Sequence, residues 1–237
     1  MVKVGLAQIQ ITENSRKNLE KVLNYIEDAG KEKADIICFP ETCLISDTLF
    51  IEPLNLFLKE ISKKCKENNI WCVVGSYADY YGIYNNTFVF NREGKIEHEY
   101  KKVHVMESEK DVIPGVSNQV INTDFGNIAV ICSFDCLFPD YIQDLSTSGA
   151  KIIFCPSNFK GLNFESFLKA VPQVRSFENM AYFALCDVFD KDSLSLSYVA
   201  SPEKVLGKIE GKEGLLVVDL DLEKINKLRE KFNFASA

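Results

Sequence analysis

Three segments of the chain place polar side chains directly after a predicted strand, and in the first and third of them that strand is an apolar run. They read FPE at 39–41, YKKVH at 100–104 and GNIAVICSFDCLFPD at 126–140. Apolar runs of this length are typical of buried strands, and α/β sheets bind their ligands just beyond the carboxyl ends of strands. A carboxylate can move a proton, an ammonium can stabilise negative charge, and a hydroxyl or thiol can attack a carbonyl carbon. The three segments therefore contain the parts of a site for nucleophilic catalysis.

The elements that would position these segments alternate between strand and helix in the first half of the chain. The pattern predicts strands at 2–8, 36–39 and 70–75, with amphipathic helices around 19–26 and 54–65 between them. A hairpin is expected at 87–99, because the turn 91–94 reads NREG. Later strands are predicted at 128–132, 151–155, 181–188, 195–200 and 214–219, and helices from 139, near 164–179 and at 222–231. Pro172 should interrupt the second of these helices or begin part of it. This order predicts a single α/β domain over 1–237.

Composition excludes several classes of protein. The formal net charge of -7 argues against general nucleic-acid binding. There is no apolar run long enough for a membrane helix and no signal-peptide pattern, so the cytoplasm is the expected location. The chain has eight cysteines, no CxxC pair and two histidines, and most of the cysteines sit in apolar runs. We therefore expect buried thiols, and neither a disulfide scaffold nor a metal site.

The three segments, taken in order, resemble the nitrilase superfamily of carbon–nitrogen hydrolases. The resemblance continues through PSNF at 156–159, RSFEN at 175–179, SPEKVLGK at 201–208 and the charged terminal helix. It implies a sandwich of two facing mixed sheets with helices outside, an α-β-β-α arrangement. It also implies a small linear amide or carbamoyl substrate, no metal or cofactor, and a homodimer formed through outer helices.

Roles follow from the resemblance position by position. Glu41 matches the general base, and Lys102 matches the cation that stabilises the tetrahedral intermediate. When SFDCLFPD is aligned without gaps on its FPD end, Ser133 takes the place of the family's nucleophilic cysteine. The backbone N–H of Phe134 would then help to hold the oxyanion. Glu109 is the candidate for a further glutamate of the site, in competition with Glu107.

Several alternatives remain open at this point. Cys132 could be the nucleophile if one residue is inserted after it, but strand alternation would then turn its side chain to the opposite face from Ser133. Cys136 is the second substitute. Asn158, which follows a predicted strand, could line the pocket. The serine also permits two other interpretations, a non-catalytic binding relative or a cysteine replaced deliberately to trap substrate. Arg175 and Glu178 are expected to form a structural ion pair.

Overall fold

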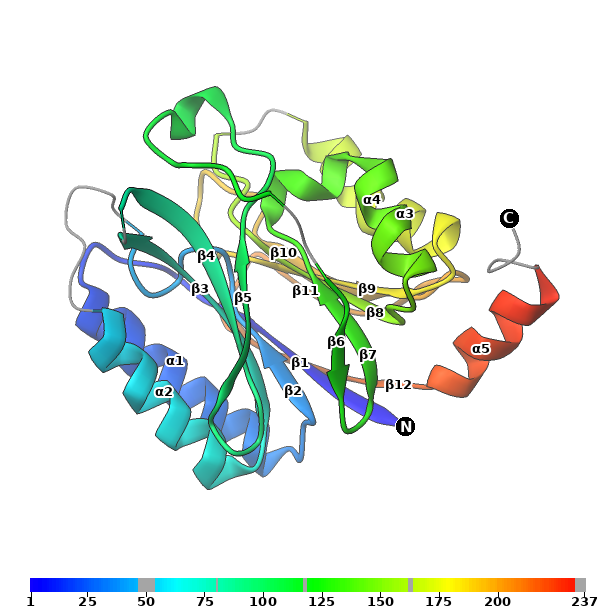
Figure 1. Cartoon of the computed structure of the whole chain (residues 1–237), viewed down its shortest axis with the longest axis horizontal. Helices are drawn as coiled ribbons and strands as arrows, with labels where there is room; N and C mark the ends of the chain where they lie inside the picture. Colours follow the sequence, from blue (N-terminus) through cyan, green and yellow to red (C-terminus); the bar gives the residue numbers. More distant parts are fainter. Residues whose placement is uncertain (47–53, 80, 117–118, 162–163, 233–237) are drawn as a thin grey trace.

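Two six-stranded sheets form the centre of the computed structural model (Figure 1). The structure describes residues 1–46, 54–79, 81–116, 119–161 and 164–232. In the first sheet the strands lie in the order β12 (Gly214–Leu220), β1 (Val2–Gln8), β2 (Ile36–Cys38), β3 (Trp71–Asp79), β4 (Ile83–Phe90) and β5 (Ile96–Lys101). In the second the order is β11 (Val205–Glu210), β10 (Leu196–Ala200), β9 (Tyr182–Asp187), β8 (Ile152–Ser157), β7 (Gly126–Val130) and β6 (Ile121–Thr123).

Both sheets are mixed, and each has three parallel strands at its centre. In the first sheet β1, β2 and β3 run parallel, and in the second β7, β8 and β9 do so. The remaining pairings are antiparallel, including the β4–β5 hairpin that the turn at 91–94 predicted. Within each sheet the parallel strands point their carboxyl ends to one edge, so residues that follow β2 lie at that edge of the first sheet and residues that follow β7 at that edge of the second.

Helices cover the outer faces of the sandwich. Helices α1 (Ser15–Lys31) and α2 (Leu54–Asn68) pack on the first sheet, and α3 (Pro139–Thr147) and α4 (Glu165–Glu178) pack on the second (Figure 1). Helix α5 (Leu222–Lys231) follows β12. Side-chain caps fix two of the helix starts: Asn14 accepts the Lys17 N–H at 3.0 Å, and Asp221 accepts the Glu223 N–H at 3.1 Å. The predicted α-β-β-α sandwich is confirmed.

Strand alternation divides the core into layers. Val4 and Leu6 of β1 face the space between the sheets, where Ile128 and Val130 of β7 also lie. The intervening side chains face outward, as Ile37 of β2 does beneath α1 and α2. Because successive strand side chains point to opposite faces, each sheet contributes one apolar face to the central layer and one to a helix layer.

Three local expectations differ from the structure. Helix α4 continues through Pro172, whose ring is buried, so the proline neither interrupts nor begins it. The strand expected at 128–132 ends at Val130 and is followed by a short 3-10 helix, Ser133–Leu137. Two short strands, β6 and β11, are additions that the pattern did not predict. Among the residues described, no helix is long and apolar enough to cross a membrane.

Candidate active site

Three strand ends bring a carboxylate, an ammonium and a thiol together. Glu41 lies three residues beyond β2, Lys102 directly follows β5, and Cys132 lies two residues beyond β7. Glu41 and Lys102 thus come from one sheet and Cys132 from the other. All three are buried, with relative exposures of 4%, 1% and 0%. A fourth residue, Glu109, reaches the same place from the short 3-10 helix Glu107–Glu109.

Glu41 lies at the centre of this group. Its Oε1 is 2.9 Å from Lys102 Nζ and accepts a hydrogen bond from the Cys132 thiol at 3.3 Å. The amide of Asn85 in β4 donates to the same oxygen at 2.8 Å. Lys102 Nζ also donates to both oxygens of Glu109, at 2.9 and 2.8 Å. We call these five residues (Glu41, Asn85, Lys102, Glu109 and Cys132) the Cys132 cluster.

Charge and burial set the protonation of the Cys132 cluster. Burial, and next the Glu41 carboxylate, raise the pKa of the Cys132 thiol well above its usual range, although Lys102 opposes this. Burial tends to lower the pKa of Lys102, but Glu41 and Glu109 outweigh that effect and the pKa is raised. The resting cluster therefore holds a protonated thiol beside a carboxylate and a permanent ammonium.

Asp135 fixes the turn that carries Cys132. Its Oδ2 accepts the Cys132 N–H at 3.0 Å and the hydroxyl of Tyr100. Its Oδ1 accepts the His104 N–H at 2.8 Å and lies 2.8 Å from His104 Nδ1. The His104 ring in turn stacks on Phe138 with centroids 3.5 Å apart. One buried carboxylate thus ties the end of β5, which carries Lys102, to the turn after β7.

Ser133 does not join the Cys132 cluster, contrary to the gapless alignment. Its Oγ is buried and, within the described part of the chain, has no hydrogen-bond partner. Its backbone adopts the left-handed region, with φ of 46°. The side chain of Cys132 faces the space between the sheets, as those of Ile128 and Val130 do. The 3-10 helix begins directly after Cys132, where an alignment on Cys132 would require one inserted residue. Cys136 lies in the outer layer near α3 and α4, away from Glu41.

The other expected residues divide into two groups. Glu109 contacts Lys102, as expected, whereas Glu107 is exposed. Asn158 Oδ1 accepts the Lys160 N–H at 3.4 Å and makes no recorded contact with the Cys132 cluster. The ring of Phe134 meets that of Phe138 edge to face. The residue directly after Cys132 is Ser133, so the N–H of Phe134 would not be the one next to a nucleophile at Cys132.

Sequence reasoning missed Asn85 and Asp135. Asn85 is 1% exposed in the interior of β4, so its amide is a buried polar group that must find partners inside the protein. The signal available was an Asn-Asn pair, residues 85 and 86, within an otherwise strand-like run. The expected ion pair does form: Arg175 Nη1 lies 2.7 Å from Glu178 Oε2. No group of three or more potential metal ligands occurs in the described ranges.

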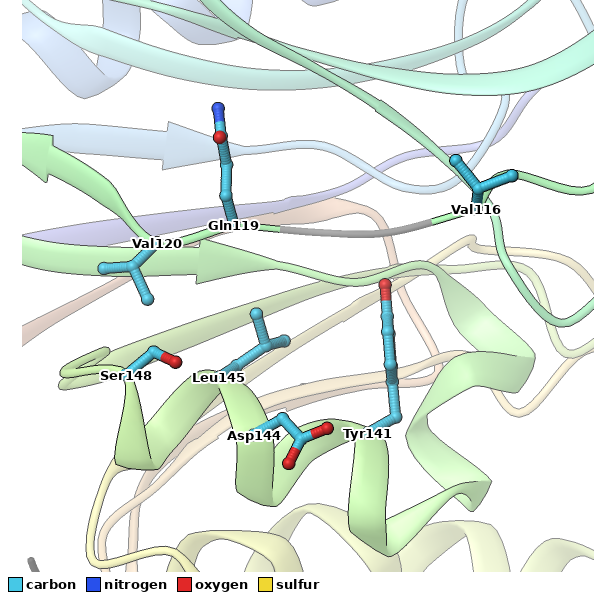
Figure 2. Close-up of a pocket in the computed structure, with 7 residues that line it drawn as sticks. All are labelled: Val116, Gln119, Val120, Tyr141, Asp144, Leu145 and Ser148. Carbon is cyan, nitrogen blue, oxygen red and sulfur yellow. The ribbon is translucent and has the colours of Figure 1, made fainter.

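Two pockets differ in their relation to the Cys132 cluster. One, of about 300 Å³, is lined by Glu13, Ser46, Tyr77, Ser108, Glu109, Asp111 and Val112. It touches the cluster through Glu109. The other, of about 310 Å³, lies between α3 and the segment around Gln119 and is lined by Val116, Gln119, Val120, Tyr141, Asp144, Leu145 and Ser148 (Figure 2). No residue of this second pocket belongs to the cluster.

Comparison with known proteins identifies the family of this chain. The model of the carbon–nitrogen hydrolase family matches residues 3–230. A deaminated glutathione amidase from Dictyostelium discoideum is 26% identical over 263 residues, which cover 96% of this chain and 90% of the relative. A 2-oxoglutaramate amidase from Bacillus subtilis (strain 168) is 24% identical, with 90% and 88% covered.

Solved structures support the same fold. An amidase variant from Nesterenkonia sp. AN1, solved with the product of Michael addition of acrylamide at its active-site cysteine, has a TM-score of 0.85 to this chain. The two are 17% identical, and 98% of each is covered. The family model spans nearly the whole chain, and amidases stand among its relatives. The chain therefore belongs to the carbon–nitrogen hydrolase family and is an amidase-like hydrolase.

Proposed function

We propose that the chain hydrolyses a small linear amide or carbamoyl compound through a thioester formed on Cys132. The observation that carries this proposal is the contact between Cys132 Sγ and Glu41 Oε1 at 3.3 Å, beside Lys102 Nζ at 2.9 Å from the same oxygen. This replaces the sequence-based hypothesis that Ser133 occupies the nucleophile position. A thiol beside the Glu41 carboxylate supports an active enzyme over a non-catalytic relative or a serine trap.

The first half of the reaction forms the acyl-enzyme. Glu41 accepts the thiol proton as Sγ attacks the amide carbon, and the carbonyl oxygen becomes an oxyanion. Lys102, whose ammonium lies 2.9 Å from Glu41, and the N–H of Ser133, the residue after the proposed nucleophile, would stabilise that charge. Glu41 then returns the proton to the leaving nitrogen. The C–N bond breaks, ammonia departs and the acyl group stays on sulfur.

The second half releases the acid. Glu41, again a carboxylate, takes a proton from water as the water attacks the thioester carbon. The C–S bond breaks and the proton returns to sulfur, so the thiol is restored and a carboxylic acid leaves. Glu109 and Asn85 position Lys102 and Glu41 throughout, because each is hydrogen-bonded to them in the resting cluster. No step needs a metal or a cofactor.

The relatives support the reaction class. Their names describe amidases that act on deaminated glutathione and on 2-oxoglutaramate. The structure of the Nesterenkonia amidase variant is described with acrylamide attached to an active-site cysteine. An amide substrate and a cysteine nucleophile are therefore the expectations that we carry to this chain, while the acyl group is left open by these names.

Ammonia release from a panel of small amides tests the proposal. The natural chain should be active and Cys132→Ala inactive. Ser133→Ala should retain most of the activity, because the Ser133 Oγ has no hydrogen-bond partner among the residues that the structure describes. The Ser133 variant is the matched control, since it alters the next residue of the same turn. Loss of turnover in Ser133→Ala with retention in Cys132→Ala would place the nucleophile at 133.

We also infer that the protein forms a homodimer through the outer face of α4. Phe167, Val174 and Phe177 are exposed there at 54%, 43% and 58%, with Phe164 next to them at 65%. A run of aromatic and aliphatic side chains on one helix face is typical of an interface between proteins. A two-fold axis would bring the same face of a second copy onto it. The family resemblance names a second copy of this chain as the partner.

A further inference from the structure

We propose that Gly75 in β3 is a positioning residue for Glu41. Because Gly75 has no side chain, the turn that carries Glu41 (residues 40–43) lies directly on the strand, and this close packing holds the carboxylate beside Cys132. The inference rests on the proposed function and deepens it, since it names a residue that acts on the reaction through the general base.

The turn that carries Glu41 interrupts the pairing of the chain with β3. Before the turn, the Phe39 N–H donates to the Val73 carbonyl oxygen at 2.9 Å, and after it the Leu44 N–H donates to the Gly75 carbonyl oxygen at 3.1 Å. Val73 and Gly75 are two residues apart along β3, whereas Phe39 and Leu44 are five residues apart. The additional residues must therefore loop out over the strand, and Glu41 is one of them.

The backbone of this turn approaches Gly75 more closely than a side chain would permit. A β-carbon at this position would be 2.7 Å from the Thr42 nitrogen, 3.2 Å from the Pro40 carbonyl oxygen and 3.3 Å from the Glu41 carbonyl carbon. Nonbonded heavy atoms attract each other best at about 3.5–4.0 Å, so the first of these contacts would be a clash. All three atoms belong to the backbone, which does not rotate away as the end of a long side chain does.

The turn is also held in place on its other sides. Its residues are buried, and Glu41 and Thr42 have relative exposures of 4% and 3%. Thr42 already has a left-handed backbone with φ of 49°, a conformation that residues with a β-carbon rarely adopt. The Cys43 thiol donates to the Gly75 carbonyl oxygen at 3.5 Å. A methyl group at position 75 would therefore move the turn, and Glu41 would move with it.

A small movement of Glu41 is enough to affect turnover. Its Oε1 lies 3.3 Å from Cys132 Sγ and 2.9 Å from Lys102 Nζ. Proton transfer requires the base within hydrogen-bond reach of the proton that it accepts, and a misplacement of about 1 Å lowers a rate by up to ~10²-fold. Substitution of Gly75 should therefore lower kcat by displacing the base.

A double-mutant cycle with valeramide tests whether Gly75 acts through Glu41. The natural chain, Gly75→Ala, Glu41→Gln and the double variant are compared by ammonia release, at enzyme concentrations high enough to follow the residual activity of Glu41→Gln. Gly75→Ala should lower kcat by at least ~10-fold and change KM by less than ~3-fold. In the Glu41→Gln background the same substitution should change kcat by less than ~2-fold, because no base is left to displace.

Two other glycines provide matched controls. Gly5 lies in β1 of the same sheet, and a β-carbon there would be 3.5 Å from Leu215 Cδ1, an ordinary van der Waals contact. Gly5→Ala should leave kcat unchanged. Gly94 lies in the turn before β5, at the opposite end of that strand from Lys102, and a β-carbon there would clash with the Ser62 carbonyl oxygen. Gly94→Ala should lower the urea midpoint and leave kcat unchanged, which separates loss of stability from loss of positioning.

Two further measurements keep the test decisive. A crystal structure of Gly75→Ala should show the contact between Glu41 and Cys132 broken and the strand pairing of both sheets retained. If Gly75→Ala does not fold, a glycine inserted after Thr42 serves in its place, because it lengthens the turn without adding a side chain to the core. This insertion should lower kcat by at least ~10-fold as well.

The outcomes distinguish this inference from the function on which it rests. A retained contact between Glu41 and Cys132, an unchanged kcat in the variant tested, or an equal loss of kcat with Glu41 and with Gln at position 41 would overturn the inference and leave the amidase proposal standing. Turnover by Glu41→Gln at the natural rate would contradict the role of Glu41 in the proposed function, and this inference with it.

Discussion

At the scale of single residues, Glu41 is the group on which proton transfer depends. Glutamine at this position keeps the shape and can still accept hydrogen bonds from Asn85 and Lys102, but it cannot take the Cys132 proton. Because burial and the site's carboxylate raise the pKa of that thiol, little thiolate forms without a base. We expect Glu41→Gln to lower kcat by about 10²-fold or more and to leave the circular dichroism spectrum unchanged. Equal turnover would show that Glu41 has only a structural role.

Lys102 and Glu109 form a buried ion pair, and each charge is costly to bury without the other. Removing the ammonium alone, in Lys102→Met, leaves Glu41 and Glu109 facing each other at a site with 5% and 10% side-chain exposure. We expect a loss of roughly 3–5 kcal/mol in the free energy of unfolding. The double variant Lys102→Met, Glu109→Gln should lose less than the single Lys102→Met, since one of the two unpaired carboxylates is then neutral. Urea unfolding measures the free energy of unfolding of the single and the double variant. If the losses of the two substitutions simply add, Lys102 and Glu109 do not depend on each other.

At the scale of elements, the strand ends explain what the sequence predicted. Glu41 and Lys102 were singled out by their match to the family's motifs, and the structure brings both to the ends of strands, β2 and β5. The proposed nucleophile, Cys132, is not the residue that the alignment favours, because the alignment is anchored on the Phe-Pro-Asp end of the segment and takes the chain after β7 to be free of insertions. Alternation correctly separates Cys132 from Ser133, but it does not say which face holds the site. The contact between Glu41 from one sheet and Cys132 from the other favours the face that carries Cys132.

Asp187, at the end of β9, makes the free energy of unfolding depend on pH. Burial raises its pKa to about 7, although hydrogen bonds from the Phe159 N–H and Ser193 Oγ favour the charged form. A carboxyl whose pKa is higher in the folded chain than in the unfolded one contributes stability that is fully present at low pH. That contribution is lost as the pH rises from about 4 to about 7.

Asp187→Asn should remove this dependence, because an amide does not titrate. Its free energy of unfolding should change little between pH 5 and pH 8, whereas that of the natural chain should fall by an amount on the order of 2 kcal/mol. Urea unfolding at the two pH values makes the comparison. Asp190→Asn is the control, since Asp190 lies in the same loop and is only partly buried. An equal fall in the natural chain and in Asp187→Asn would contradict the assignment.

At the scale of the whole molecule, the sequence predicted the sandwich because local periodicities identified most of its strands and helices. It could not predict the contacts that join the two sheets. The bonds from Asp135 to His104 and Tyr100 span 31 and 35 residues, and no local pattern encodes them. Asn85 was missed for the same reason, as its partner Glu41 is 44 residues away. The single domain over 1–237 stays a prediction.

The proposed dimer forms through the outer face of α4. Phe167→Glu with Phe177→Glu places two charges on the α4 face and should convert the protein from dimer to monomer, as measured by light scattering over a range of concentrations. Leu56→Glu is the control, because Leu56 is also exposed, at 45%, on an outer helix of the other layer. A monomer in the natural chain, or a dimer that survives the double substitution, would contradict the assigned face.

The proposed mechanism places an acyl group on the Cys132 sulfur, and trapping this intermediate tests the assignment of the nucleophile. A reaction with valeramide is quenched in acid and digested, and fragment-ion mass spectrometry locates the pentanoyl group within the peptide that contains residues 132, 133 and 136. We predict a pentanoyl adduct on Cys132 that hydroxylamine removes and that is absent from Cys132→Ala. An adduct on Ser133 or Cys136, or turnover by Cys132→Ala at the natural rate, would contradict the mechanism.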